Sequence, residues 1–197
     1  MTTPESAREA EAARATKETT IEVRLRLGSR ETRAATGVGF FDHLLTAASF
    51  HGRWGLAIDA RGDLHVDYHH LVEDAGLVIG DAFRQLAAAS PGIARFASAW
   101  APMDEALAHV VVDVSGRGGA HVDPAIAAGA TRDFDAGLAR EFLIAFARSA
   151  GITLHARLLA GEDTHHRLEA LFKALGMCLA RAFEPADGGV PSTKGAL

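Results

Sequence analysis

Two short motifs of the same form contain the residues best suited to chemistry. They read HHLVE at residues 69–73 and, 96 residues later, HHRLE at residues 165–169. Imidazole and carboxylate groups without a thiolate form a donor set that suits Mn²⁺, Fe²⁺ or Zn²⁺. The motifs therefore indicate metal binding, and the number of available ligands favours octahedral Mn²⁺ over Zn²⁺.

Each motif begins a stretch whose apolar residues have helical spacing. In both stretches these residues follow the first histidine at offsets of 3, 6, 7, 10 and 14, so the two helices bury faces of the same phase. Residues four apart share a helix face, so the first histidine of each motif can act with its glutamate. Adjacent residues diverge by about 100°, so the paired histidines serve two different ions, one of which can be shared with another subunit.

A further potential ligand precedes each motif by a similar distance. His43 lies 26 residues before His69, and Glu141 lies 24 residues before His165. The repetition of one donor followed by HHxxE predicts an internal duplication, with enough donors for two metal sites that keep positions open for a substrate. The predicted metal ligands are His43, His69, His70, Glu73, Glu141, His165, His166 and Glu169.

The elements that position these motifs follow from the hydrophobic pattern. Residues 19–27 alternate between apolar and polar types, as expected of a half-buried strand. Further strands are predicted from after the turn at Gly28 and Ser29 to about Gly37, and at 54–60, 63–68, 95–103, 106–115, 118–123 and 152–158. Helices are predicted at 40–50, 69–89, 135–150 and 164–182. Helices thus alternate with mostly antiparallel strands, which predicts an α+β fold of duplicated half-domains.

The length of 197 residues suits one compact catalytic unit made of two repeats. We expect a flexible lead-in at 1–16, a first repeat at 17–92 and a second repeat at 93–197, which ends in a loop-like tail from residue 184.

Composition excludes several classes of function. The chain is 48% hydrophobic and 23% charged, which is typical of a soluble globular protein. Its net charge of −5 argues against a nucleic-acid partner, and no apolar run is long enough to span a membrane. The single cysteine, Cys178, excludes an internal disulfide and suits the cytoplasm. Four isolated histidines, His65, His109, His121 and His155, are more typical of ordinary surface or core residues.

Several motifs occur in an order that resembles the imidazoleglycerol-phosphate dehydratase family. They are GFFDH (39–43), DYHHLVED (67–74), SGR (115–117), GITLH (151–155), HHRLEALFKALG (165–176) and PSTKG (191–195). The resemblance covers about residues 14–197. It implies helices packed between two mostly antiparallel four-stranded sheets. It also implies a homo-oligomer of 24 subunits built from trimers, with metals and active sites at the subunit interfaces.

The resemblance further implies a hydro-lyase of histidine biosynthesis. Such an enzyme converts D-erythro-imidazole glycerol phosphate to imidazole acetol phosphate and water, and binds the substrate imidazole or imidazolate at a dimanganese site, with Fe²⁺ or Zn²⁺ as substitutes. The implied catalytic residues are Glu18, which would act as acid or base, and His43, His69, Glu73 and Glu169. The implied substrate-binding residues are Glu18, His51, Arg95, Arg117, Lys173, Ser192, Thr193 and Lys194, the last three in a phosphate-binding tail.

Four positions depart from the usual pattern of the family. Glu141 stands where many relatives have histidine, and Asp163 stands where an asparagine is common. Tyr68 and Leu71, which flank the first histidine pair, would change the hydrogen bonds that orient the ligands. These departures leave open a metal-stapled paralogue without catalysis. The ligand set alone also permits a dinuclear metallohydrolase, which the predicted phosphate-binding residues disfavour.

Overall fold

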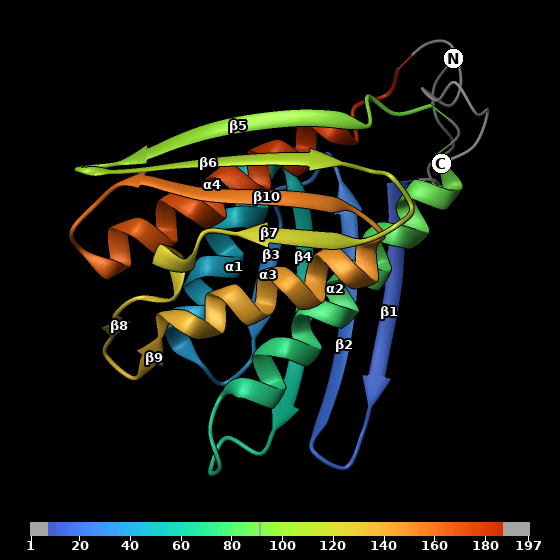
Figure 1. The fold of residues 1–197 in the computed structure, drawn as a ribbon. Coiled ribbons are helices and arrows are strands. Elements are labelled where there is room, and N and C mark those ends of the chain that lie inside the picture. Colours follow the sequence, from blue (N-terminus) through green and yellow to red (C-terminus); the bar gives the residue numbers. More distant parts are fainter. Residues whose placement is uncertain (1–7, 91, 187–197) are drawn as a thin grey trace.

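The computed structural model describes residues 8–90 and 92–186 and arranges them as two four-stranded sheets with helices between them (Figure 1). The strands of the first sheet, in spatial order, are β1 (Glu9–Ala15), β2 (Thr19–Leu27), β4 (Trp54–Gly62) and β3 (Thr32–Ala35). Those of the second are β5 (Phe96–Met103), β6 (Ala106–Asp113), β10 (Thr153–Ala160) and β7 (Gly119–Val122). In each sheet the first two strand pairs are antiparallel and the third is parallel.

The helices occupy equivalent places in the two halves of the chain. They are α1 (Gly39–Gly52), α2 (His69–Ala89), α3 (Ala136–Ala150) and α4 (Thr164–Ala182). The second half adds the short elements η2 (Pro124–Ala127), β8 (Ala130–Thr131) and β9 (Phe134–Asp135) before α3. Each half otherwise runs strand, strand, strand, helix, strand, helix, which confirms the predicted duplicated α+β fold. None of the helices in the described part of the chain is long and apolar enough to cross a membrane.

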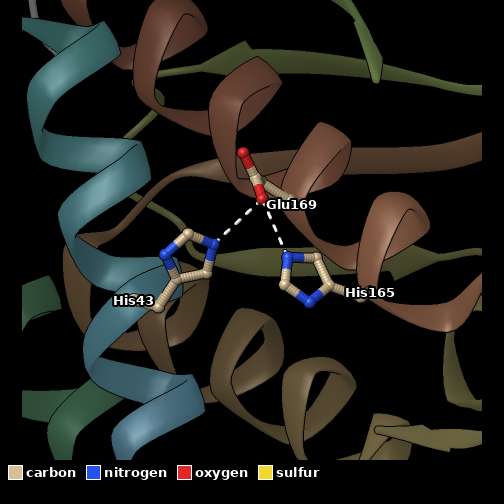
Figure 2. Close-up of side chains that lie close together, drawn as sticks. All are labelled: His43, His165 and Glu169. Carbon is tan, nitrogen blue, oxygen red and sulfur yellow. Dashed lines mark hydrogen bonds and ion pairs between the residues drawn. The ribbon is translucent and has the colours of Figure 1, made fainter. Parts of the chain in front are cut away.

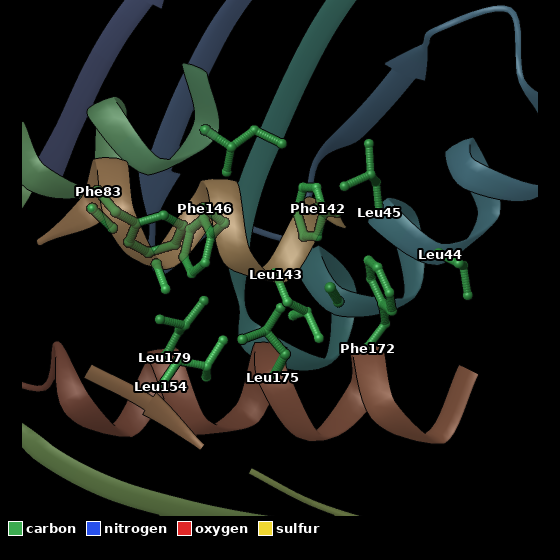
Figure 3. Packing of buried hydrophobic residues seen from close by; sticks show 14 of the residues in the cluster. Leu44, Leu45, Phe83, Phe142, Leu143, Phe146, Leu154, Phe172, Leu175 and Leu179 are labelled. Carbon is green, nitrogen blue, oxygen red and sulfur yellow. The ribbon is translucent and has the colours of Figure 1, made fainter. Parts of the chain in front are cut away.

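The helices form two layers that bury the inward faces of both sheets. Helices α1 and α2 pack on the first sheet, α3 and α4 pack on the second, and the layers meet through the pairs α1–α4 and α2–α3. Alternation along the strands explains this arrangement, because the apolar residues of β2 point inward and the charged residues between them point outward. The buried residues of that strand are Ile21, Val23 and Leu25. Phenylalanines fill much of the space between the helices (Figure 3).

Two glycines at matching positions allow the helix pairs to approach closely. Gly80 of α2 and Gly176 of α4 each lie eleven residues after the first histidine of their motif. A Cβ on Gly80 would lie 2.6 Å from the backbone oxygen of Phe146 in α3, and one on Gly176 would overlap the backbone oxygen of Ala48 in α1. Only glycine leaves room for a carbonyl at these two crossings.

Two of the predicted elements are wrong. Residues 9–15 form strand β1 instead of a flexible lead-in, because Ala10 and Ala12 alternate with glutamates and pair with β2. The strand predicted at 63–68 is a turn, in which the Val66 amide donates to the Asp63 carbonyl at 2.8 Å. That turn leads directly into α2, where the Asp67 carboxylate accepts from the His69 amide at 2.8 Å.

Candidate metal centre

Helices α1 and α4 bring together three of the predicted ligands, although these helices come from opposite halves of the chain (Figure 2). His43 Nε2 lies 2.9 Å from Glu169 Oε2, and His165 Nε2 lies 3.1 Å from the same oxygen. All three donor atoms lie within 4.8 Å of one another, and no other set of three or more such donors is gathered this closely in the described ranges. The spacing of the HHxxE motif therefore places His165 and Glu169 together as predicted.

Glu169 is ionised at neutral pH despite its burial. Its side chain is only 11% exposed, and burial by itself raises the pKa of the carboxyl. Hydrogen bonds from Lys173, His43 and His165 outweigh burial and lower the pKa to about 2. Lys173 Nζ lies 2.6 Å from Glu169 Oε1, on the side away from the histidines.

The chemistry of this donor set fits a divalent cation. Two imidazole nitrogens converge on one anionic oxygen, and these are the donor types that Mn²⁺, Fe²⁺ and Zn²⁺ accept. The side chains of His43 and His165 are 45% and 42% exposed, so an ion and a further ligand could reach them from solvent.

Helices α2 and α3 carry a second, looser set of predicted ligands. His69 Nε2 lies 3.6 Å from Glu73 Oε2 on the next turn of α2. Glu73 also faces Arg148 of α3 at 3.6 Å, and Glu141 accepts from Arg140 at 2.9 Å. Glu141 belongs to α3, the helix that packs against α2 and its histidine motif. Its carboxylate, however, pairs with Arg140 and not with the histidines of that motif.

Helix packing identifies Glu141 as the counterpart of His43. Gly80 contacts the backbone of α3 at Phe146, and Gly176 contacts the backbone of α1 at Ala48. These contacts lie five residues after Glu141 and five residues after His43, respectively. The two candidate ligands thus occupy equivalent positions in equivalent helix pairs, which agrees with the duplication expected from the sequence.

The ring of the second histidine of each motif lies nearly perpendicular to that of the first and is held by a carboxylate. His70 Nδ1 lies 3.0 Å from Asp63 Oδ2, and His166 Nδ1 lies 2.8 Å from Glu105 Oε2. These hydrogen bonds are the main reason that the pKa values of both histidines are raised, against the opposing effect of burial. A carboxylate on Nδ1 leaves Nε2 to bind a metal and fixes the orientation of the ring.

Sequence reasoning missed Asp63 and Glu105. Glu105 lies 61 residues before His166 and meets it only through the fold, in the turn between β5 and β6. Its pKa is lowered to about 2, first by the backbone amide of Asp163 and then by His166. The available signal was a pair of acidic residues, Asp104 and Glu105, in a predicted hairpin turn of the second repeat.

Glu18 lies in the turn between β1 and β2, beside the first motif. Its side chain is 57% exposed, and Oε2 is 3.8 Å from His70 Nδ1. A carboxylate here is accessible to a small molecule bound at the N-terminal end of α2. Its predicted role in acid–base chemistry is compatible with this position.

The two predicted phosphate-binding arginines share one carboxylate. Arg95 donates through Nε to Asp113 Oδ1 at 2.7 Å, and Arg117 Nη2 lies 3.8 Å from Asp113 Oδ2. Arg95 is largely buried, whereas the side chain of Arg117 is 70% exposed and available to an anion. The structure therefore brings these two residues together.

His51 and Lys173 continue from the α1–α4 ligand set along the same two helices. His51 lies eight residues after His43, and Lys173 lies four residues after Glu169. Burial lowers the pKa of His51 most, and the nearby Lys173 lowers it further. The remaining predicted substrate-binding residues, Ser192, Thr193 and Lys194, lie outside the described residues.

Comparison with known proteins identifies the family of this chain. A family model described as imidazoleglycerol-phosphate dehydratase matches residues 36–179. The chain is 48% identical over 187 residues to the imidazoleglycerol-phosphate dehydratase of Lacticaseibacillus casei (strain BL23), covering 93% of this chain and 96% of the relative.

Two solved structures share the fold. The imidazoleglycerol-phosphate dehydratase of Staphylococcus aureus matches with a TM-score of 0.82 and 33% identity, covering 90% of this chain and 99% of that one. The enzyme of Pyrococcus furiosus, solved in complex with (S)-C348, matches with a TM-score of 0.82 and 40% identity, covering 94% and 99%. With the paired HHxxE helices and the duplicated sheets, these matches show that the chain belongs to the imidazoleglycerol-phosphate dehydratase family of hydro-lyases.

Proposed function

We propose that this protein converts D-erythro-imidazole glycerol phosphate to imidazole acetol phosphate and water, using two Mn²⁺ ions per active site. The observation that carries the proposal is the convergence of His43, His165 and the ionised Glu169 from two helices. It occurs in a chain that is 48% identical to an imidazoleglycerol-phosphate dehydratase.

Two ligand sets, one on each helix pair, would hold the metals. One is His43, His165 and Glu169, and the other is His69, Glu73 and Glu141. The N-terminal ends of α2 and α4 lie at different edges of the molecule (Figure 1), so the two sets do not form one cluster within a chain. We propose that His70 and His166 complete the sites of neighbouring subunits in a 24-subunit assembly. Bound Mn²⁺ would supply a Lewis acid that holds the imidazole ring of the substrate and stabilises negative charge on it.

The side chains of this protein would then bind the substrate and move its protons. Glu18 would take the proton from C2 of the glycerol chain, since its carboxylate is exposed beside the first motif. Loss of the C3 hydroxyl as water leaves an enol, and release of the proton from the enol hydroxyl on C2 together with addition of a proton to C3 gives the ketone. The atoms lost, one hydrogen and one hydroxyl, make the released water.

Binding of the phosphate would position the ring and the chain for this reaction. Arg117 offers an exposed guanidinium, and Arg95 lies beside the same aspartate. Lys173 and His51 would line the approach from α4 and α1, and Ser192, Thr193 and Lys194 would complete the phosphate site. Energy from such remote contacts can be used to orient the reacting carbon.

The departures from the family pattern at Tyr68 and Leu71 leave the hydrogen bonds that His69 and His70 make with carboxylates in place. Tyr68 donates to Asp133 at 2.8 Å, and Leu71 is buried in the core. His70 keeps its contact with Asp63, and the His69 amide donates to Asp67. The remaining departure at a ligand position, Glu141, pairs with Arg140 at 2.9 Å, so the alternative of a paralogue without catalysis rests on that residue. Family membership argues against a metallohydrolase.

The test is turnover of imidazole glycerol phosphate by the purified protein loaded with Mn²⁺. We expect formation of the ketone product, about two Mn²⁺ per chain by metal analysis, and a mass near 24 subunits. Glu169→Gln should abolish turnover, whereas His109→Ala, a histidine on the outer face of β6, should not. Metal-loaded protein that forms no ketone would contradict the proposal.

A further inference from the structure

The turn that carries Glu18 is attached to helix α2 by one buried carboxylate, that of Asp74. Asp74 Oδ1 accepts from Arg14 Nε of β1 at 2.9 Å, and Oδ2 accepts from Thr19 Oγ1 of β2 at 2.5 Å. Asp74 and Thr19 are only 8% and 3% exposed. Both oxygens of Asp74 are therefore occupied, each by a different strand of the hairpin.

The same turn is also rigid within itself. Thr16 Oγ1 accepts from the amides of Glu18 and Thr19 at 3.1 and 2.9 Å, and the Thr16 amide donates to the Thr19 carbonyl at 2.8 Å. A threonine side chain that accepts in this way fixes the backbone of a short turn. Since Thr19 is in turn bonded to Asp74, the position of Glu18 is set relative to α2.

Asp74 is well placed to transmit this constraint to the metal-binding motif. It follows Glu73 directly and lies four residues after His70, on the same face of α2. Glu18 Oε2 lies 3.8 Å from the ring of that histidine. Asp74, which bonds the hairpin, and His70, which faces Glu18, are therefore one helical turn apart on α2.

The second repeat lacks the hydrogen bonds that Asp74 makes in the first, and its turn glutamate is fixed in a different way. The residue equivalent to Asp74 is Ala170, which is fully buried and has no polar group. There the turn between β5 and β6 carries Glu105, which contacts His166 at 2.8 Å and accepts from the amides of Glu162 and Asp163 at 3.1 and 2.9 Å. Glu105 is thus held by its own carboxylate.

The two turn glutamates differ in how they are fixed. In the first repeat Asp63 takes the contact with the histidine, so the carboxylate of Glu18 is left accessible while its backbone is held. A glutamate that must transfer a proton needs a free carboxylate in a fixed position.

We propose that Asp74 and Thr19 are positioning residues that hold Glu18 over the metal-binding helix for proton transfer. This inference rests on the proposed function, because it assumes that Glu18 acts in the dehydration. The Asp74–Thr19 bond contributes through the placement of Glu18 and not through binding of the metal or of the phosphate.

The test compares Thr19→Val with Thr19→Ser in the Mn²⁺-loaded protein. Valine keeps the shape of the side chain but removes its hydroxyl group, whereas serine keeps the hydroxyl group. We expect Thr19→Val to lower kcat at least about tenfold, since small displacements of a reacting group have large effects. KM and metal content should stay within about twofold of the unsubstituted protein, and amide hydrogen exchange should accelerate in residues 16–19. Thr19→Ser should restore most of kcat, and Thr20→Val, on the exposed side of β2, should have little effect.

A double-substitution cycle with Glu18→Gln separates positioning from a general loss of structure. If Thr19 acts through Glu18, adding Thr19→Val to Glu18→Gln lowers kcat by less than about twofold. An equal loss in both backgrounds, or an unchanged kcat in Thr19→Val while exchange in the turn accelerates, would overturn the inference. If the double variant is too slow to assay, failure of Thr19→Ser to restore kcat overturns it. Absence of turnover in the unsubstituted protein would instead refute the proposed function.

Discussion

Protonation of Glu169 should lower the free energy of unfolding of the metal-free protein, and the lowered pKa of this carboxyl gives the size of the effect. The pKa of this carboxyl falls from an ordinary 4.5 to about 2, so its ionised form favours the folded state by about 3 kcal/mol. Because the folded-state pKa is the lower one, this stabilisation is present above pH 4.5 and is lost as the pH falls towards 2. Lys173, His43 and His165 supply it through their hydrogen bonds.

Glu169→Gln mimics the protonated carboxyl at every pH. In urea denaturation with a chelator present, the variant should be less stable than the unsubstituted protein by about 3 kcal/mol at pH 7 and by about 1.5 kcal/mol at pH 3. Glu73→Gln, at the equivalent but more exposed position, should cost less than about 1 kcal/mol.

A difference between Glu169→Gln and the unsubstituted protein that is the same at pH 7 and pH 3 would refute this reasoning. It would mean that glutamine disturbs the packing of α1 against α4 and that the charge of the carboxylate is not the cause. Comparison at several pH values therefore tests the electrostatic explanation separately from the size of the effect.

Three other predictions follow from the geometry. Gly80→Ala should destabilise the protein by at least about 1–3 kcal/mol in urea denaturation, because its Cβ meets the α3 backbone, whereas Gly39→Ala, with open space around its Cβ, should not. Asp63→Asn and Glu105→Gln should each weaken Mn²⁺ binding about 10- to 100-fold in competition with a chelator, with little change in far-UV circular dichroism. Arg117→Ala should raise KM about tenfold or more while kcat changes less, if its exposed guanidinium binds the substrate phosphate; an unchanged KM would exclude that role.

The parts of the fold that follow a strong local period could be predicted from the sequence. Helices α2 and α4 begin at the histidine motifs because the offsets of their apolar residues match a buried helix face. Strand β1 was missed because its buried residues are alanines, whose small side chains give a weak alternation and favour a helix in isolation. It becomes a strand only through pairing with β2.

The sequence could predict which donor residues on one helix lie together, but not the distant residues that hydrogen-bond to the residues of the site. His165 and Glu169 meet because four residues make about one helical turn. Glu105 and Asp74 meet His166 and Thr19 across 61 and 55 residues, and neither contact has a local signal. These supporting contacts depend on strand register and hairpin position, which are set by the packing of the whole chain.

The close contacts at Gly80 and Gly176 also fix the crossing angle of each helix pair, so a small change in that angle moves the distant end of the helix. Each contact is the pivot, and the first histidine of the motif lies eleven residues away, which at 1.5 Å per residue is about 16 Å along the helix axis. A change of only about 4° in the crossing angle would move that end of the helix by about 1 Å, a displacement that can cost about 100-fold in rate. Core substitutions far from any ligand could therefore displace the metal ligands and lower the reaction rate, even though every donor residue in the sequence is unchanged.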